Sequence, residues 1–106
     1  MYANKIVLIT GGSSGLGKNL ALSYAREKAK IINLSRNSQK MAILNSVLNK
    51  LNSQKNKFYS VDVSDYDKIL EVKDIILREN NIPDIIINNA AGNFLCPFEN
   101  LSKNGW

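Results

Sequence analysis

Residues 6–17 read IVLITGGSSGLG, in which an apolar and largely β-branched run stops at a glycine-rich turn. A continuous run of this kind is typical of a parallel strand that is buried on both faces. Beyond the turn, apolar residues recur at helical spacing up to about Lys28: Leu16, Leu20, Ala21, Tyr24 and Ala25. The stretch therefore predicts a strand, a turn and an amphipathic helix, in that order.

The same alternation continues along the chain and predicts a parallel sheet. We expect three more strands, at residues 31–35, 58–61 and 84–88. Each of the two helices between them begins after a polar N-cap, either Asn37 or Ser38 in the first and either Ser64 or Asp65 in the second. Right-handed crossovers then give an α/β fold, a doubly wound, Rossmann-like parallel sheet with the strand order 3-2-1-4.

Composition narrows the class of protein. The 106 residues carry 14 Lys plus Arg and 9 Asp plus Glu, a net charge of +5, and no histidine. A histidine-dependent nucleophile or an imidazole metal ligand is therefore excluded within them, and we expect no metal site. The single Cys96 cannot form an internal disulfide and is interpreted as a packing residue.

Neither a nucleic acid nor a membrane is an expected partner. The lysines are scattered singly, without a basic block or interleaved aromatic residues. The apolar runs are far shorter than the roughly 20 residues that span a bilayer, and the first run is too short for a signal peptide. We expect an intracellular protein, and the cytoplasmic, peroxisomal and mitochondrial compartments all stay open.

The glycine-rich turn has the context of a phosphate-binding site. Gly11, Gly15 and Gly17 give the spacing G-x-x-x-G-x-G between a strand and a helix. Free N–H groups at the helix start and the helix dipole can bind a phosphate, and the hydroxyls of Ser13 and Ser14 add donors. The alternative is an ordinary turn between a strand and a helix.

The end of the second strand indicates which nucleotide is bound. An NAD site generally places an acidic residue there to bind the ribose 2′-hydroxyl, whereas a 2′-phosphate needs a cation. This chain has Ser35-Arg36, which favours NADPH, unless Arg36 is only a solvated surface residue. Lys18, in the first turn of the helix, either adds positive potential or faces water.

These features resemble the short-chain dehydrogenases/reductases, whose cofactor signature is T-G-x-x-x-G-x-G. Asp62-Val63 looks like the adenine contact of that family, and residues 88–92, NNAAG, look like its N-N-A-G segment with Ala91 in the usual glycine position. The resemblance covers essentially the whole chain. It implies that NADPH is bound by Gly11, Gly12, Ser13, Ser14, Gly15, Leu16, Gly17, Arg36, Asp62, Val63, Ala90 and Gly92.

Within that family, residues 88–97, NNAAGNFLCP, followed by Leu101-Ser102, resemble the 2,4-dienoyl-CoA reductases. The resemblance implies an acyl-CoA substrate and reduction of a 2,4-dienoyl-CoA to a 3-enoyl-CoA. It also implies that Asn93 donates a hydrogen bond to the thioester oxygen and that Arg36, Phe94 and Ser102 contact the substrate. Ser64 departs from the arginine that some members have at that position.

Several alternatives to this interpretation stay open. Asn88 and Asn89 can instead satisfy backbone groups, and Phe94 can be a core residue. The substrate can be another acyl or carbonyl compound, or the chain can be a non-catalytic NADP-binding module. The fifteen asparagines fall mostly in predicted turns and on predicted helix surfaces, and they are interpreted as saying little about mechanism.

The family's Tyr-x-x-x-Lys acid pair has one match, Tyr24 with Lys28, which lies on the first helix and is assigned to the core instead. The strand at 84–88 would also be left as a bare apolar edge. We therefore expect residues 1–106 to be the N-terminal cofactor-binding half of one reductase domain, inactive alone and homo-oligomeric when complete.

Overall fold

The computed structural model describes residues 2–11, 13 and 15–89. It confirms a four-stranded parallel sheet in the order β3-β2-β1-β4. The strands are β1 (Ile6–Thr10), β2 (Lys30–Ser35), β3 (Lys57–Ser60) and β4 (Ile85–Asn88). The helices between them are α1 (Gly15–Arg26), α2 (Ser38–Leu51) and α3 (Tyr66–Arg78).

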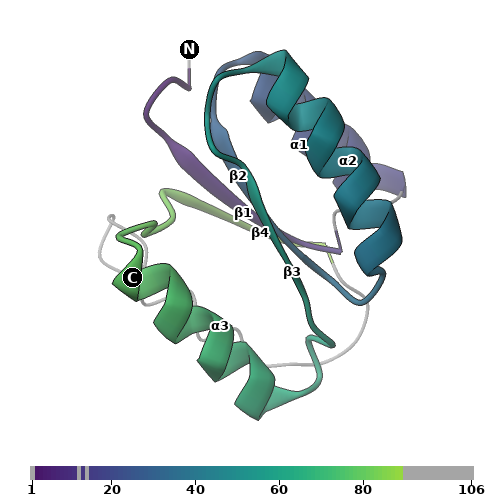
Figure 1. Cartoon of the computed structure of the whole chain (residues 1–106), viewed down its shortest axis with the longest axis vertical. Helices are drawn as coiled ribbons and strands as arrows, with labels where there is room; N and C mark the ends of the chain where they lie inside the picture. Colours follow the sequence, from purple (N-terminus) through teal and green to yellow (C-terminus); the bar gives the residue numbers. More distant parts are fainter. Residues whose placement is uncertain (1, 12, 14, 90–106) are drawn as a thin grey trace.

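The sheet lies between two helical layers. Helices α1 and α2 cover one face and α3 covers the other (Figure 1). The buried residues on the α1/α2 side are Val7, Ile9, Ala21, Ala25, Ala29, Ile31, Leu44 and Leu48. Those on the α3 side are Leu8, Ile32, Leu34, Val61, Ile69, Val72 and Ile76. Successive apolar residues of β1 and β2 enter opposite cores, as the two-residue period of a strand requires. This explains why both faces of these strands carry apolar residues, with the buried Asn33 of β2 as the exception.

Local side-chain bonds set where the helices begin. The side chain of Asn37 accepts a hydrogen bond from the backbone N–H of Lys40 at 2.9 Å, which makes Asn37 the N-cap of α2. Asp65 caps α3 in the same way by accepting from the N–H of Lys68 at 3.3 Å. Each is one of the two residues that the sequence offered for that position, and each satisfies a backbone donor that the helix itself leaves free.

Three expectations about element limits and faces were wrong in detail. Helix α1 ends at Arg26, because Lys28 adopts a left-handed backbone with φ of 74°. Strand β3 spans Lys57–Ser60, so its first and last residues each lie one position earlier than predicted. Leu16 is 65% exposed, because the stripe of α1 that faces the sheet is centred on Gly17 and continues through Ala21 and Ala25, with Leu16 on its flank at the helix start.

Buried asparagines close the amino end of the sheet. The backbone N–H of Ile31 donates to Oδ1 of Asn56 at 2.8 Å, and Nδ2 of Asn56 donates to Oδ1 of Asn52 at 3.1 Å. Nδ2 of Asn52 in turn donates to the carbonyls of Ala25 and Ala29, both at 3.0 Å. Asn52 and Asn56 lie in the turn region between α2 and β3, as expected of asparagines, but both are buried. Their hydrogen bonds join the end of α1, the start of β2 and the end of α2.

In the part of the chain that the structure describes, no helix is long and apolar enough to cross a bilayer.

Candidate nucleotide-binding site

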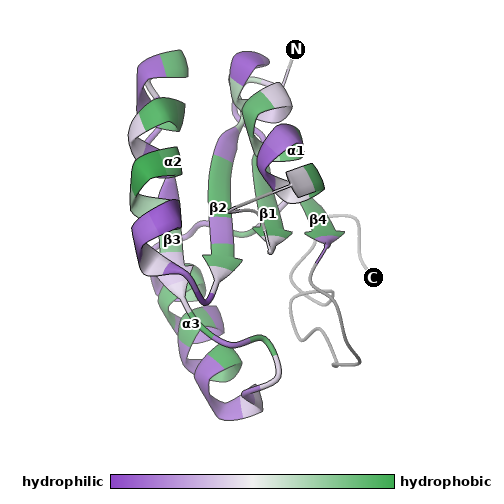
Figure 2. Ribbon diagram, turned by 90° about the vertical axis from the view of Figure 1, so that its right-hand side faces the viewer, coloured by the Kyte–Doolittle hydropathy of each residue, from purple (hydrophilic) through white to green (hydrophobic). Residues whose placement is uncertain are grey.

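The predicted polar residues meet at the carboxyl edge of the sheet. The register aligns Thr10 of β1 with Leu34 of β2 and with Asn88 of β4, so the strands end together. Figure 2 shows the arrowheads of β2, β1 and β4 at the same end. Because ligands of open parallel sheets bind beyond these ends, and at the place where the strand order reverses, the edge between β1 and β4 is the expected site.

Two glycines of the turn after β1 have a backbone that other residues rarely adopt. Gly11 has φ of 70° and Gly15 has φ of 58°, in the left-handed region that costs other residues about 1–2 kcal/mol. The N–H of Gly11 donates to the carbonyl of Leu34 at 2.7 Å, which anchors the turn to β2. A Cβ added at Gly15 would meet nothing within 4 Å, so the start of α1 faces open space.

The start of α1 suits an anion. Its first turn contains no acidic residue, and the same is true of α2, whereas the first turn of α3 contains Asp67. An Asp or Glu there would normally stabilise a helix by interacting with its dipole. Free N–H groups at an unneutralised helix start are a common phosphate-binding arrangement, and the open space at Gly15 makes those of α1 accessible.

A pair of hydroxyls joins the glycine turn to the end of β2. Oγ of Ser13 lies 3.0 Å from Oγ of Ser35, within hydrogen-bond distance. Both side chains are half-buried. The second strand thus ends in a hydroxyl followed by Arg36, with no carboxylate at the position where NAD sites generally have one.

Arg36 lies at the outer rim of this edge, opposite Asp62. The guanidinium is 3.8 Å from the Asp62 carboxylate, and the two side chains are 80% and 46% exposed. The pKa of Asp62 is lowered, chiefly by the hydroxyl and the backbone N–H of Ser64, which donate to it at 2.7 and 2.9 Å, and to a lesser extent by Arg36. An exposed pair of this kind is held weakly, so Arg36 is free to turn toward an anion.

The end of β4 is fastened to the glycine turn by Asn89. Its backbone N–H donates to Oγ1 of Thr10 at 3.0 Å, and its Nδ2 donates to the carbonyl of Gly11 at 3.1 Å. Thr10 also donates to Oδ1 of Asn88 at 3.3 Å. The side chain of Asn89 thus satisfies a backbone group, which is the alternative role that the sequence left open for it. The sequence analysis did not predict that Thr10 links β1 to the end of β4. The feature that could have indicated it is a polar residue at the end of an otherwise apolar strand.

The remaining predicted residues divide into described and undescribed ones. Val63 is half-buried and follows Asp62, whereas Leu16 is exposed beside the glycine turn. Tyr24 packs edge-to-face against Tyr2, with ring centroids 5.2 Å apart, which agrees with a core role. Seven predicted site residues lie outside the described residues, as does Cys96: Gly12, Ser14, Ala90, Gly92, Asn93, Phe94 and Ser102.

Comparison with known proteins gives a consistent result. Residues 5–106 match the family model described as short chain dehydrogenase. A peroxisomal 2,4-dienoyl-CoA reductase of Danio rerio is 34% identical over 106 residues, which are 100% of this chain and 35% of that protein. An NADPH-dependent pterin aldehyde reductase of Arabidopsis thaliana is 36% identical over 91 residues, 86% of this chain and 37% of that protein.

A solved structure shares the fold of the described chain. The short chain dehydrogenase from Escherichia coli CFT073, described as putative and complexed with NADPH, superposes with a TM-score of 0.77 at 26% identity. The match covers 85% of this chain and 38% of that chain. The chain spans about a third of the length of the curated relatives it matches.

Proposed function

Because the chain belongs to the short-chain dehydrogenase family, we propose that it forms the NADPH-binding part of an oxidoreductase that reduces an unsaturated acyl-CoA. The observation that carries the cofactor half of this proposal is the edge of β2, where a hydroxyl pair and an arginine stand in place of a carboxylate. Three further observations support it: the left-handed glycines, the open start of α1 and the NADPH complex of a structural neighbour.

The described residues fit NADPH. The N–H groups at the start of α1 would bind the pyrophosphate, which approaches closely because Gly15 has no side chain. Ser13, Ser35 and Arg36 would bind the 2′-phosphate, with the planar guanidinium as the charged donor. Asp62 and Val63 would contact the adenine. When bound, NADPH supplies a hydride, and the role of these residues would be to hold and orient the cofactor.

The proposed reaction is reduction of a 2,4-dienoyl-CoA to a 3-enoyl-CoA. It rests on the segment NNAAGNFLCP and on relatives that are dienoyl-CoA reductases. Asn93 would donate a hydrogen bond to the thioester oxygen, which gains negative charge as the hydride adds to the diene. Phe94 and Ser102 would contact the acyl group. A homo-oligomeric assembly of the complete enzyme belongs to the same proposal.

The cofactor is tested by direct titration of the chain with NADPH and with NADH. We expect NADPH to bind more tightly, and Arg36→Ala to weaken its binding by about tenfold while changing NADH little, because only NADPH carries the 2′-phosphate. Arg78→Ala is the matched control, since Arg78 is an exposed arginine in the last turn of α3. Equal binding of the two cofactors by the unaltered chain would contradict the assignment.

The reaction is tested by supplying the C-terminal two thirds of a dienoyl-CoA reductase in trans and following NADPH oxidation. We expect oxidation with 2,4-hexadienoyl-CoA. Oxidation with a 3-ketoacyl-CoA alone would select a carbonyl reductase, the second candidate, which the similarity to a pterin aldehyde reductase favours. NADPH binding without turnover of either compound would select a non-catalytic binding module.

A further inference from the structure

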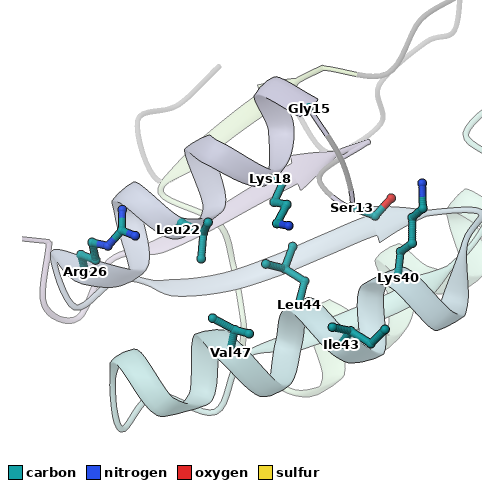
Figure 3. Close-up of a pocket in the computed structure, with 9 residues that line it drawn as sticks. All are labelled: Ser13, Gly15, Lys18, Leu22, Arg26, Lys40, Ile43, Leu44 and Val47. Atoms are coloured by element: carbon teal, nitrogen blue, oxygen red, sulfur yellow. The ribbon is translucent and has the colours of Figure 1, made fainter.

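The outer surface between α1 and α2 is hollowed by a cavity of about 590 Å³, which we call the α1/α2 groove. It is lined by Ser13, Gly15, Lys18, Leu22, Arg26, Lys40, Ile43, Leu44 and Val47. The groove starts beside the glycine turn and follows the two helices away from it (Figure 3). Its volume lies within the roughly 300–1,000 Å³ of small-molecule sites.

The floor of the groove is apolar. Leu22 of α1 points toward Leu44 and Val47 of α2 (Figure 3). Ile43, which continues this surface, is 69% exposed, and Val47 is 42% exposed. Covering exposed aliphatic side chains with an apolar ligand lowers the free energy, because it removes apolar surface from water.

The charges around this floor are all positive. Lys18 and Arg26 each lie about one helical turn from Leu22 on α1, one on either side of it. Lys40 lies in the first turn of α2. No carboxylate lines the groove, and neither helix contains an Asp or Glu. Helix α3, by contrast, carries three acidic residues in its 13 residues, Asp67, Glu71 and Asp74. The groove therefore offers cations to a ligand without offering any anion.

We propose that the α1/α2 groove binds a long-chain fatty carboxylate. The aliphatic chain lies over Leu22, Leu44 and Val47, and the carboxylate faces Lys18 and Lys40 at the Ser13 end, where two of the three cations lie. The groove runs between two helices and has an apolar floor, so a single aliphatic chain can lie along it. The cations of the lining have no carboxylate of the lining beside them, so they can bind the anionic head of the ligand. The groove shares Ser13 and Gly15 with the proposed NADPH site, whereas Leu22, Ile43, Leu44 and Val47 belong to the groove alone. The proposal rests on these apolar residues and on the cations beside them and does not require NADPH to be bound.

Binding is tested by calorimetric titration of the chain with sodium dodecanoate below its micellar concentration. We expect saturable binding with one site per chain. The double variant Lys18→Gln/Lys40→Gln should weaken it by about tenfold through loss of the charged contacts. Lys50→Gln is the matched control, because Lys50 is an exposed lysine of α2 that does not line the groove and should leave the affinity unchanged.

The apolar floor is tested by Ile43→Gln, a substitution at an exposed position that should leave the fold intact and weaken dodecanoate binding. Circular dichroism and the unfolding midpoint check that each variant is folded. Absence of saturable binding would overturn the proposal, and so would equally tight binding of dodecanol, which has the chain without the charge. Binding to anionic vesicles without binding to free dodecanoate, or self-association detected by sedimentation, would assign the surface to another occupant.

Discussion

The two ends of the same sheet are built on different principles. At the amino end, polar side chains bond to the backbone and to one another: Asp84 accepts from the N–H of Ile6 at 2.9 Å, and the ammonium of Lys30 donates to Asn81 at 2.8 Å. Asn52 and Asn56 are buried there. At the carboxyl end, most polar side chains are partly exposed, and the turn beside them has two left-handed glycines, of which Gly15 faces open space.

This difference separates stability from function within one small fold. When one of two buried, hydrogen-bonded polar groups is removed, the free energy of unfolding falls strongly, because the other group is left without a hydrogen bond. Exposed hydroxyls and cations lose little when they are changed, since water replaces their partners. Substitutions at the amino end should therefore act on folding, and substitutions at the carboxyl end on ligand binding.

The largest expected effect is at the amino end. Asn56→Ala removes the acceptor of the buried N–H of Ile31 together with the bonds that Nδ2 donates to Asn49 and Asn52. We expect a loss of about 3 kcal/mol in the free energy of unfolding, measured with urea, because a buried donor is left unsatisfied. Asn19→Ala, at an exposed position of α1, is the control. If Asn56→Ala lowered the free energy of unfolding no more than Asn19→Ala does, the proposed difference between the two ends of the sheet would be wrong.

A smaller effect on stability is expected at the carboxyl end. Gly15→Ala should cost about 1 kcal/mol, because alanine must adopt φ of 58° although its Cβ has free space. Gly15→Asn should cost less, since asparagine tolerates that backbone. Both side chains enter the space proposed for the pyrophosphate, so both should weaken NADPH binding more than they lower stability. Unchanged NADPH affinity in both variants would show that this space is not used.

The smallest effect concerns the edge strand β3. Tyr59 donates a hydrogen bond to Glu79 at 3.2 Å, and burial together with the charge of Glu79 raises its pKa to about 12. Since a raised pKa favours the neutral phenol in the folded state, this contribution to stability is complete below pH 10 and is lost as the pH rises toward 12. The loss is small, because the pair is partly exposed to water.

Tyr59→Phe should remove this part of the alkaline decline in the unfolding midpoint. Tyr66→Phe is the matched control, because Tyr66 is 51% exposed at the start of α3. If the Tyr59→Phe variant declined between pH 10 and 12 as steeply as the unaltered chain, the ionisation of Tyr59 would make no contribution to the alkaline loss of stability.

The order of the elements along the chain followed from the sequence because it depends on period alone, and the strand order followed from the rules for crossovers in doubly wound sheets. The apolar run at 6–9, the largely apolar run at 31–34 and the helical spacing after Gly15 identify strands and helices without any knowledge of their contacts. The rule that parallel sheets bind ligands beyond their carboxyl ends then placed Ser35 and Asp62 at one edge. The Ser13–Ser35 hydroxyl contact within that edge was not predicted, although both residues were in view.

The asparagine contacts at the amino end could not be predicted in the same way. Periodicity shows which face of a helix is buried, and an asparagine at 52 or 56 reads as a turn residue. Its partners, such as the carbonyls of Ala25 and Ala29, lie more than twenty residues away in the sequence and come close only once α1 and α2 have packed. Leu16 was wrongly predicted to belong to the buried stripe of α1 for a related reason. The helical spacing of apolar residues does not show which end of a helix extends beyond the sheet.

The absence of acidic residues from α1 and α2, set against the three in α3, has a consequence for kinetics. Helix α3 also carries three basic residues, Lys68, Lys73 and Arg78, so its net charge is zero, whereas α1 and α2 carry only cations, Lys18, Arg26, Lys40 and Lys50. The net positive charge of the described helices therefore lies on one side of the sheet and gives them an electric dipole across it. At low ionic strength such a dipole rotates an approaching polyanion and draws it to the cationic side before any contact forms. The rate at which an anionic ligand arrives, rather than the rate at which it leaves, should therefore fall as salt shortens the Debye length.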